Sequence, residues 1–490
     1  MLEYILKIEV IELKISEKLG LNKTQFELDF IDIDIEKDLP LFIDSNLIRK
    51  YDCEFNAKLS TTMDSFFSYL LNCLSNNLDD KAKYLCSHLG EINETHLGLS
   101  KGLSKGKGVG AINSVKIFEA LKNSEAIEKG VLEDIEDLRT LVNGFDKDLL
   151  SDMLTNILKK HFLDYTIKQC ELHNIRLTEN VPSGFFWDDV ACQWDNKYMK
   201  RLIIDDKPIL LIPKKVVNYS LCGSFREYRQ HFVLNFLQEE NIRNYTSLVR
   251  KKTKTKELYV TKKDIIKTQP TINKENLSNF TIKHPEIFQK FKKENIKSSK
   301  SMPGNILDKL DIKDVCRILK ESLLSIRPGT EMASDFHNLM IGIFELLLYP
   351  NLINPNKELE INERRKRIDI CFNNVSEQGF FIYVQDKINI PCPLVFIECK
   401  NYSSDVENPE LDQLAGRFST RRGRFGILSC RNIEDEKKFI LRCSDTYKDD
   451  KKLIIPITDN DIIRCLEKNE NCTNEFEKIL FEKCTMIIKG

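Results

Sequence analysis

Apolar and polar positions alternate with two different periods over the last third of the chain. Between residues 329 and 350, apolar side chains recur at i, i+3, i+4 and i+7, which predicts an amphipathic helix that ends at Pro350. Residues 368–372 alternate with a period of two, as a half-buried strand does, and residues 394–397 form an apolar run typical of a central strand. The other predicted elements are a hairpin strand at 380–384, helices at 409–418 and 461–466, and strands at 425–430 and 453–457. We therefore expect a mixed sheet flanked by helices.

The first two thirds of the chain have weaker patterns. Alternation at 26–35 indicates a strand, helical spacing occurs at 63–74, 115–121 and 149–170, and the apolar run at 208–213 indicates some sheet. Residues 251–302 are polar and rich in Lys, Asn and Ser, which suits a helical or partly flexible connector. The expected division is a mixed α/β region at 1–95, a mostly helical region with some sheet at 96–240, a basic connector at 241–305 and a fourth domain at 306–490. The expected class is α/β, and α+β for the chain as a whole.

Composition and length narrow the class of protein. The 490 residues are too many for one ordinary core, and 41% hydrophobic with 30% charged residues is typical of a soluble globular chain. No apolar run approaches the roughly 20 residues that cross a bilayer, and the N-terminal segment has acidic residues and no basic leader, so we expect no membrane partner. The 15 cysteines are scattered and never spaced C-x2-C, which predicts mostly buried free thiols. These features predict a cytoplasmic protein.

The net charge of −1 gives no global attraction to nucleic acid, so any such partner must be held by local patches. Two compact basic clusters and one looser run are present. They are Arg364, Arg365, Lys366 and Arg367; Arg421, Arg422 and Arg424; and the Lys-rich run at 250–267. A charge run is usually a solvated face, but the two compact clusters lie on either side of the acidic and basic residues described below.

Two further motifs have ordinary explanations. Asp29, Asp32 and Asp34 could form a metal cluster only if a bulge brought them to one face, and a solvated strand face is the expectation. The segment 101–110 is rich in Gly and Lys and resembles a phosphate-binding loop, but it lacks the order G-x4-G-K-[ST]. We expect a mobile loop there, with a nucleotide site that gates a catalytic domain as the alternative.

Ionisable residues interrupt the two predicted strands of the C-terminal region. Asp369 lies on the polar face of its strand, and Glu398 and Lys400 break the apolar run two residues apart, so they share one face. Burying such groups is costly without pairing or a metal, so packing alone does not account for them. Glu345 falls at the edge of the apolar arc of the preceding helix, where its carboxylate can reach the same region.

The order helix, strand with Asp, strand with Glu-x-Lys and helix resembles the PD-(D/E)xK nuclease superfamily, which has the restriction-endonuclease-like fold. Asp369 matches the motif Asp, Glu398 the motif acid and Lys400 the motif Lys. Ile368 stands where the motif has Pro. The spelling ECKNY is closest to the type IV, Mrr-like restriction enzymes, and the resemblance covers about the last third of the chain.

The resemblance implies roles for further residues. The helical Glu of the family is matched by Glu345, with Glu331 as the alternative, and the Gln on the following helix is matched by Gln413. The family uses Mg²⁺, with Mn²⁺ as a substitute, and hard carboxylate oxygens suit both ions. The metal ligands that it implies are Asp369, Glu398 and the backbone carbonyl of Cys399.

The implied activity is metal-dependent endonuclease cleavage of DNA, and the likeness to restriction enzymes implies a role in antiviral defence. Lys400 would orient the attacking water or stabilise the phosphate, and the two arginine-rich clusters would contact flanking phosphates of double-stranded DNA. Cutting both strands is simplest with a homodimer, and the N-terminal region would recognise the substrate or a protein partner. The alternative is a catalytically inactive module that binds nucleic acid or serves assembly, with the N-terminal region as the sensor or partner-binding part.

Overall fold

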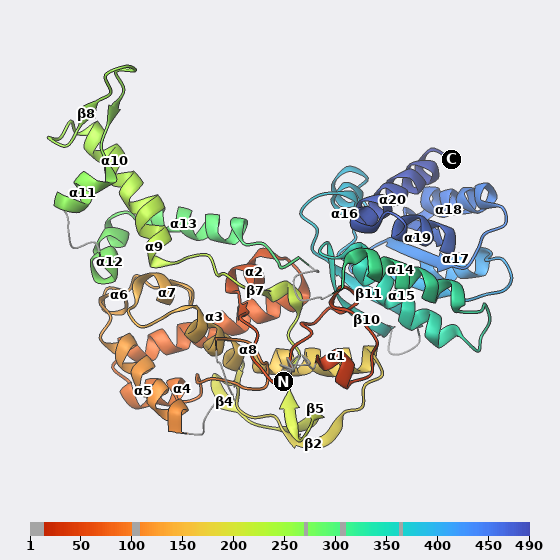
Figure 1. Cartoon of the computed structure of the whole chain (residues 1–490), viewed down its shortest axis with the longest axis horizontal. Coiled ribbons are helices and arrows are strands. Elements are labelled where there is room, and N and C mark those ends of the chain that lie inside the picture. The colour runs from red at the N-terminus through yellow and green to blue at the C-terminus, as the bar shows by residue number, and fades with distance from the viewer. Residues whose placement is uncertain (1–13, 100–107, 269–272, 304–309, 362–365) are drawn as a thin grey trace, which may run out of the picture.

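The chain forms two bodies, each with its own hydrophobic core, and an arm that projects from the first body (Figure 1). The computed structural model describes residues 14–99, 108–268, 273–303, 310–361 and 366–490. Helices make up 52% and strands 16% of it, so the class is α+β. None of the helices in these ranges is long and apolar enough to cross a membrane.

The N-terminal body is built around two long helices, α3 (Glu54–Ser75) and α8 (Lys147–Leu172), which pack against each other. Both were predicted, and apolar side chains at helical spacing, such as Leu154, are fully buried. One hydrophobic core extends from Ile15 to Met302. The expected boundaries near residues 95 and 240 do not separate independent domains, because all three regions contribute side chains to this core.

The other elements of the N-terminal body are shorter than α3 and α8. Its strands are β1 (Phe42–Ile43), β2 (Thr178–Pro182), β3 (Phe186–Asp188), β4 (Gln193–Asp195), β5 (Tyr198–Ile204), β6 (Lys207–Ile209) and β7 (Val217–Asn218). Its other helices are α1 (Ile15–Lys18), η1 (Gln25–Glu27), α2 (Ser45–Lys50), α4 (Asp79–Cys86), α5 (Gly108–Lys122), α6 (Glu125–Glu128), α7 (Asp137–Leu141) and η2 (Lys214–Val216). The strands form a sheet of order β2-β5-β6 and the pairs β1-β7 and β3-β4.

The arm corresponds to most of the predicted connector and is largely helical (Figure 1). Its elements are α9 (Phe225–Glu227), η3 (Tyr228–Val233), α10 (Leu234–Arg243), β8 (Arg250–Lys251), β9 (Leu258–Tyr259), α11 (Lys262–Thr268), α12 (Lys274–Lys283) and α13 (Pro285–Ser298). Aromatic packing joins its outgoing and returning halves, since the rings of Tyr228 and Phe291 lie 4.9 Å apart.

The C-terminal body contains a five-stranded sheet of order β10-β11-β12-β13-β14. The strands are β10 (Leu352–Ile361), β11 (Lys366–Asn374), β12 (Leu394–Lys400), β13 (Phe425–Cys430) and β14 (Leu453–Thr458). β11 is antiparallel to both β10 and β12, whereas β12, β13 and β14 run parallel. The helices are α14 (Ile312–Ser325), α15 (Ala333–Leu348), α16 (Phe380–Ile382), η4 (Tyr383–Lys387), α17 (Asn408–Ala415), α18 (Glu436–Asp450), α19 (Asp459–Leu466), η5 (Asn469–Asn471) and α20 (Cys472–Lys489).

The turn after α17 packs closely on the sheet. Phe418 stacks on Phe396 of β12 with ring centroids 5.8 Å apart. A Cβ at Gly426 would lie 2.9 Å from the Phe418 ring and 3.0 Å from the Phe396 carbonyl, so this contact requires glycine in β13. The register and the period of two place Phe396 on the same face as Glu398. α17 and its turn therefore cover the face that carries Glu398.

Two predicted strands are wrong. Residues 380–384 are helical because Phe380 packs on Phe481 of α20, with ring centroids 5.1 Å apart, and its backbone N–H donates to Glu477. Residues 26–35 form the short helix η1 followed by irregular backbone with isolated bridges. Tertiary packing overrides local pattern at both places.

The aspartates of that segment are also not on a solvated face. Asp29, Asp32 and Asp34 are all buried, and each has its own partners. Tyr165 donates to Asp29 over 2.6 Å, and the backbone N–H and hydroxyl of Ser16 donate to Asp32. These carboxylates are structural, since donors from other segments pair with Asp29 and Asp32, and the neighbouring backbone N–H of Glu36 donates to Asp34.

The two bodies share a buried boundary. Phe26 and Leu172 of the N-terminal body belong to the hydrophobic core of the C-terminal body. The backbone N–H of Asn354 in β10 donates to Asp29 over 3.1 Å, and Lys215 Nζ donates to the carbonyl of Pro350 over 2.9 Å. Apolar and polar contacts thus fix the edge of the sheet against the N-terminal body.

Candidate functional site

Three of the predicted residues lie together at one edge of the central strands. The β11–β12 register pairs Ile370 with Ile397, and continuing it by one residue places Asp369 opposite Glu398. The period of two puts Lys400 on the same face. The antiparallel pairing of β11 and β12 therefore brings the Asp369 carboxylate of β11 next to the Glu398 carboxylate and the Lys400 amine of β12.

Asp369 is the most accessible carboxylate of the group, with 19% of its side chain exposed. Its Oδ2 accepts a hydrogen bond from the backbone N–H of Cys399 over 2.9 Å and lies 3.4 Å from His337 Nε2. Burial raises the pKa of Asp369, but the contacts with His337 and the Cys399 N–H outweigh burial and hold this pKa below its ordinary value. Asp369 is therefore ionised at neutral pH.

Glu398 is fully buried and faces two cations. Lys400 Nζ lies 2.9 Å from its Oε1, and Arg417 donates to its Oε2. Lys400 also donates to Gln413 Oε1 over 3.0 Å, so the predicted glutamine on α17 holds the predicted lysine. Burial lowers the pKa of Arg417, and the negative charge of Asp369 partly offsets this effect. The guanidinium remains charged, because its ordinary pKa is far above neutral pH.

Sequence reasoning missed two members of this site, His337 and Arg417. His337 lies on α15, and its Nε2 is 3.3 Å from the Cys399 carbonyl as well as close to Asp369. Arg417 follows Gln413 by four residues, which is the spacing that places two residues on one side of a helix. That spacing was a usable signal for Arg417, whereas His337 could be placed only by the packing of α15.

Glu345 does not join the site. It is 1% exposed, and its Oε1 lies 3.0 Å from Lys214 Nζ of the N-terminal body. Burial, supported by the charge of Asp29 and opposed by Lys214, raises the pKa of Glu345 to about 7. The helical site acid predicted here is instead part of the boundary between the bodies. Its rival Glu331 lies exposed in the turn before α15.

The predicted phosphate-binding clusters are only partly described. Arg364 and Arg365 lie outside the described residues, as do the side chains of Lys366 and Arg367. In the second cluster, Arg421 is exposed. Arg422 donates to the carbonyl of Arg417 and Arg424 to Thr420, so these two guanidinium groups hold the turn that carries Arg417.

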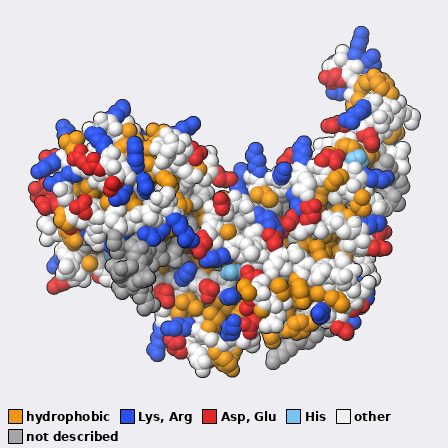
Figure 2. All heavy atoms as spheres, turned by 180° about the vertical axis from the view of Figure 1, so that it is seen from behind, with side chains coloured by type: hydrophobic (Ala, Val, Ile, Leu, Met, Phe, Trp, Pro, Cys, Tyr) orange, Lys and Arg blue, Asp and Glu red, His pale blue; other side chains and the backbone are white. Residues whose placement is uncertain are grey.

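Basic side chains also gather elsewhere. Figure 2 shows basic and acidic side chains mixed over one face of the molecule, with basic side chains at the end of the arm. The hairpin at this end carries Arg250, Lys251, Lys252, Lys254 and Lys256, all exposed. This hairpin is the described part of the Lys-rich run that extends furthest from the rest of the molecule.

The predicted metal ligands offer hard oxygen donors. Glu398 Oε1 is buried and has no hydrogen-bond partner, because the nearby Lys400 ammonium is not aligned to donate to it. Asp369 lies beside it and is partly exposed. Mg²⁺ prefers such oxygens and keeps several waters. Across the described ranges, no group of three or more His, Cys, Asp or Glu side chains could hold a metal. A metal ion at Asp369 and Glu398 would therefore need a backbone carbonyl and water to complete its ligands.

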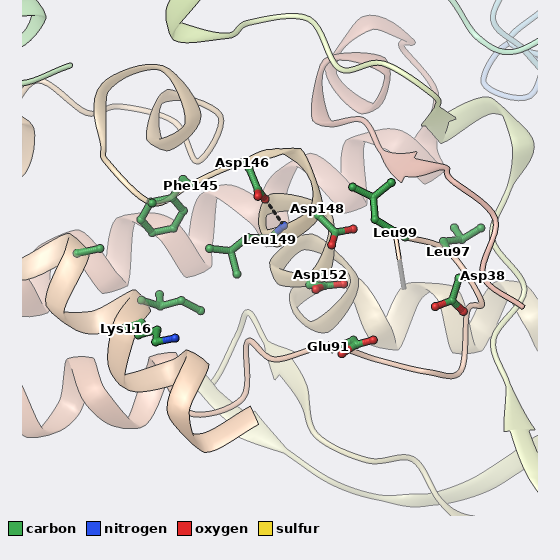
Figure 3. Close-up of a pocket in the computed structure, with 14 residues that line it drawn as sticks. Asp38, Glu91, Leu97, Leu99, Lys116, Phe145, Asp146, Asp148, Leu149 and Asp152 are labelled. Atoms are coloured by element: carbon green, nitrogen blue, oxygen red, sulfur yellow. Dashed lines mark hydrogen bonds between the residues drawn. The ribbon is translucent and has the colours of Figure 1, made fainter. Parts of the chain in front are cut away.

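A cavity lined by acidic residues lies in the N-terminal body, far from β11 and β12 in the sequence. Its volume is about 540 Å³, and Figure 3 shows that carboxylates from three segments line it. They are Asp38, Glu91, Asp146, Asp148 and Asp152. Burial and the neighbouring carboxylates raise the pKa of Asp38 to about 6 and that of Asp152 to about 8. No sequence pattern indicates this cavity, because its acids lie in segments that only the fold brings together.

The predicted free thiols are confirmed. All 15 cysteines are unpaired, and most are buried, including Cys371 and Cys399 beside the site. The Gly- and Lys-rich segment lies outside the described residues up to residue 107, and Gly108 and Gly110 fall in the first turn of α5.

Comparison with known proteins finds a family model that matches part of the chain. A family described as a domain of unknown function, DUF8370, matches residues 20–222, which lie within the N-terminal body. No curated protein and no solved structure matches the chain. The matched segment contains the acidic cavity and Lys214 but ends before the five-stranded sheet.

Proposed function

We propose that the C-terminal body is a metal-dependent endonuclease of the PD-(D/E)xK kind that hydrolyses DNA phosphodiester bonds, with a role in defence against foreign DNA. The observation that carries this proposal is the meeting of Asp369, Glu398 and Lys400 on one face of β11 and β12. The sheet order, with two antiparallel and two parallel pairings, and the helix that presents Gln413 to Lys400 support it. Unpaired cysteines suit the reducing cytoplasm as its location.

The side chains divide the chemical work. Asp369 and Glu398, with the carbonyl of Cys399, would hold Mg²⁺, which supplies Lewis acidity and a water of lowered pKa when bound. Gln413 and Glu398 fix the Lys400 ammonium, which can then donate to the attacking water or to a phosphate oxygen. His337 orients Asp369 through its contact with Oδ2.

One observation favours a second candidate, a nucleic-acid-binding module without catalysis. Arg417 occupies Oε2 of Glu398, so only Oε1 is left without a hydrogen bond. A guanidinium in this position can neutralise the buried carboxylate without a metal. In that case the site would bind phosphate through Lys400 and would cleave nothing.

A nicking assay separates the two candidates. Purified full-length protein is incubated with supercoiled plasmid and Mg²⁺, with and without EDTA, and Lys400→Ala is compared with wild type. The matched control is Lys437→Ala, which removes an exposed lysine of α18. Loss of one positioned donor should lower the rate by about 10²–10³-fold, while the control keeps the wild-type rate. Cleavage by Lys400→Ala at the wild-type rate, or EDTA-resistant cleavage, contradicts the nuclease proposal.

A further inference from the structure

A cavity of about 340 Å³ lies between the two bodies. Helices α3 and α8 form its wall on the N-terminal side, and β10, β11 and β12 form the wall on the other side. Its size falls within the range of small-molecule sites, and boundaries between bodies are common places for such sites.

The sheet wall contains a β-bulge with an unsatisfied amide. The β10–β11 register shifts between Ile353 and Asn356, and Asn354 within the bulge has φ +52°, a left-handed conformation that asparagine tolerates better than most residues. Asn354 lines the cavity and is 7% exposed, and neither the Oδ1 nor the Nδ2 of its buried amide has a hydrogen-bond partner among the described residues. Bulges often re-aim a side chain beside a functional site, and a buried amide without a partner costs free energy unless a ligand or water satisfies it.

Other lining residues have matching chemistry. Gln169 of α8 is 1% exposed, and its Oε1 also lacks a hydrogen-bond partner. Asn373 of β11 adds a third amide, which is partly exposed. Phe55 and Tyr165 form an aromatic pair on the facing wall, with ring centroids 5.9 Å apart. Amide side chains read the donor and acceptor edges of nucleobases, and aromatic rings stack on base faces.

The charges at the rim favour a neutral group inside the cavity. Glu54 and Lys58 pair over 2.6 Å, and Asp164 and Lys168 add one charge of each sign. The rim thus has no excess of charge that would draw a phosphate inside. Lys58 above all, and then Lys168 and Arg421, hold the pKa of Glu54 below its ordinary value, so this carboxylate keeps its charge at the rim.

The cavity continues along the face of the proposed catalytic site. Asp369, Cys371 and Asn373 alternate along β11 and therefore share one face, and the latter two line the cavity. Along the strand, Cys371 lies roughly 7 Å and Asn373 roughly 13 Å from Asp369. These distances correspond to a few nucleotides of a DNA strand, at about 3.4 Å each. A strand cut at Asp369 could therefore place a nearby base in the cavity.

We propose that this cavity binds an unpaired nucleobase of the nucleic acid substrate, with its edge against Asn354, Gln169 and Asn373 and its face against Phe55. The inference rests on the proposed nuclease function for its substrate. A base can enter a closed pocket only after it leaves the helical stack, so single-stranded or locally opened DNA is the expected ligand. The same amide and aromatic side chains could also bind the base of a free mononucleotide, which is the alternative ligand.

Binding in EDTA tests this inference without cleavage. Anisotropy of a labelled single-stranded oligonucleotide is measured with full-length wild type, Asn373→Ala and Phe55→Ala, and a series of single abasic sites is moved along the strand. The matched control is Asn244→Ala, an exposed asparagine at the end of α10. We expect each cavity variant to weaken binding roughly tenfold and the abasic strand to bind weakly at one position only, because one base contact is lost in each case. The control should bind as wild type does.

The outcomes are distinct. Equal affinity of wild type and both cavity variants, or no binding of single strands by wild type, overturns the inference. Competition by free AMP, CMP, GMP or TMP that depends on Asn373 and Phe55 supports the cavity as a base site and assigns it to a free nucleotide. Cavity-dependent binding without any Mg²⁺-dependent nicking overturns the nuclease proposal alone. Nicking with cavity-independent binding overturns the base site alone. Gln169→Leu serves as a further variant should Phe55→Ala fail to fold, as judged by circular dichroism.

Discussion

The ion pair between Lys214 and Glu345 joins the two bodies, and its removal should destabilise the protein in a pH-dependent way. Lys214 and Glu345 are both almost completely buried, with Nζ and Oε1 3.0 Å apart, and this contact lacks hydrogen-bond alignment. Lys214→Met keeps most of the side-chain volume and removes the ammonium. The carboxylate of Glu345 is then left buried near Asp29, whose charge already disfavours its ionised form.

The magnitude follows from the protonation of Glu345. Burial raises its folded pKa to about 7, above the ordinary value of 4.5, so the stability that it contributes is present at low pH and is lost as pH rises toward 7. Without Lys214 the folded pKa rises further, and the loss continues above pH 7 at about 1.4 kcal/mol per pH unit. We expect the variant to lose about 3 kcal/mol of unfolding free energy at pH 9, two pH units above 7, and this loss is at the lower end of the usual cost of breaking a buried pair. The expected loss at pH 6 is less than about 1 kcal/mol, because Glu345 is protonated there.

Urea denaturation followed by circular dichroism at pH 6 and pH 9 measures these differences. The double variant Lys214→Met/Glu345→Gln should recover most of the loss at pH 9, because no buried charge remains unpaired. The control Lys58→Met removes the lysine of an exposed pair and should cost less than about 1 kcal/mol at either pH. A pH-independent loss, or a double variant as unstable as the single one at pH 9, would refute the reasoning.

Three further predictions concern other charged groups. Asp152→Asn should raise the melting temperature at pH 9 and leave it unchanged at pH 4. The folded pKa of Asp152 is about 8, above the ordinary 3.8, so the wild-type protein loses stability as pH rises from 4 to 9. We expect this loss to be about 2 kcal/mol once the partial exposure of the carboxylate is allowed for. Arg417→Met should lower the unfolding free energy by about 3 kcal/mol in urea at pH 7, since it leaves a buried carboxylate with one cation instead of two, and a loss below about 1 kcal/mol would contradict this pairing. Replacing Lys251, Lys254 and Lys256 by Ala should reduce the slope of log affinity for double-stranded DNA against log salt by about 2–3, measured by anisotropy, and an unchanged slope would exclude the arm from phosphate contact.

Hydrophobic periodicity determined the elements that are long and regular. The period of 3.6 located α8 and α15, and the continuous apolar run located β12, because these elements bury the face that their own sequence marks. The same rule placed Glu398 and Lys400 on one side of β12 without reference to any other segment. Gln413 was found through the family resemblance, and the structure places its Oε1 on Lys400.

Tertiary structure decided the partners of the buried charges. Glu345 meets Lys214, which lies 131 positions earlier in the chain, and the backbone of Asn354 meets Asp29 across an even longer separation. A local pattern shows that a residue lies near the edge of an apolar face but not which body covers that face. His337 entered the site for the same reason, since the packing of α15 against β12 determines its contact with Asp369.

The sequence alone therefore determined the strand that carries the acid and the amine, since alternation along one strand is a local property of the backbone. It could not determine the cavity between the bodies or the acidic cavity of the N-terminal body, whose walls come from segments far apart in the chain. Pairing between distant segments depends on how whole faces pack, and only the folded chain brings those faces together.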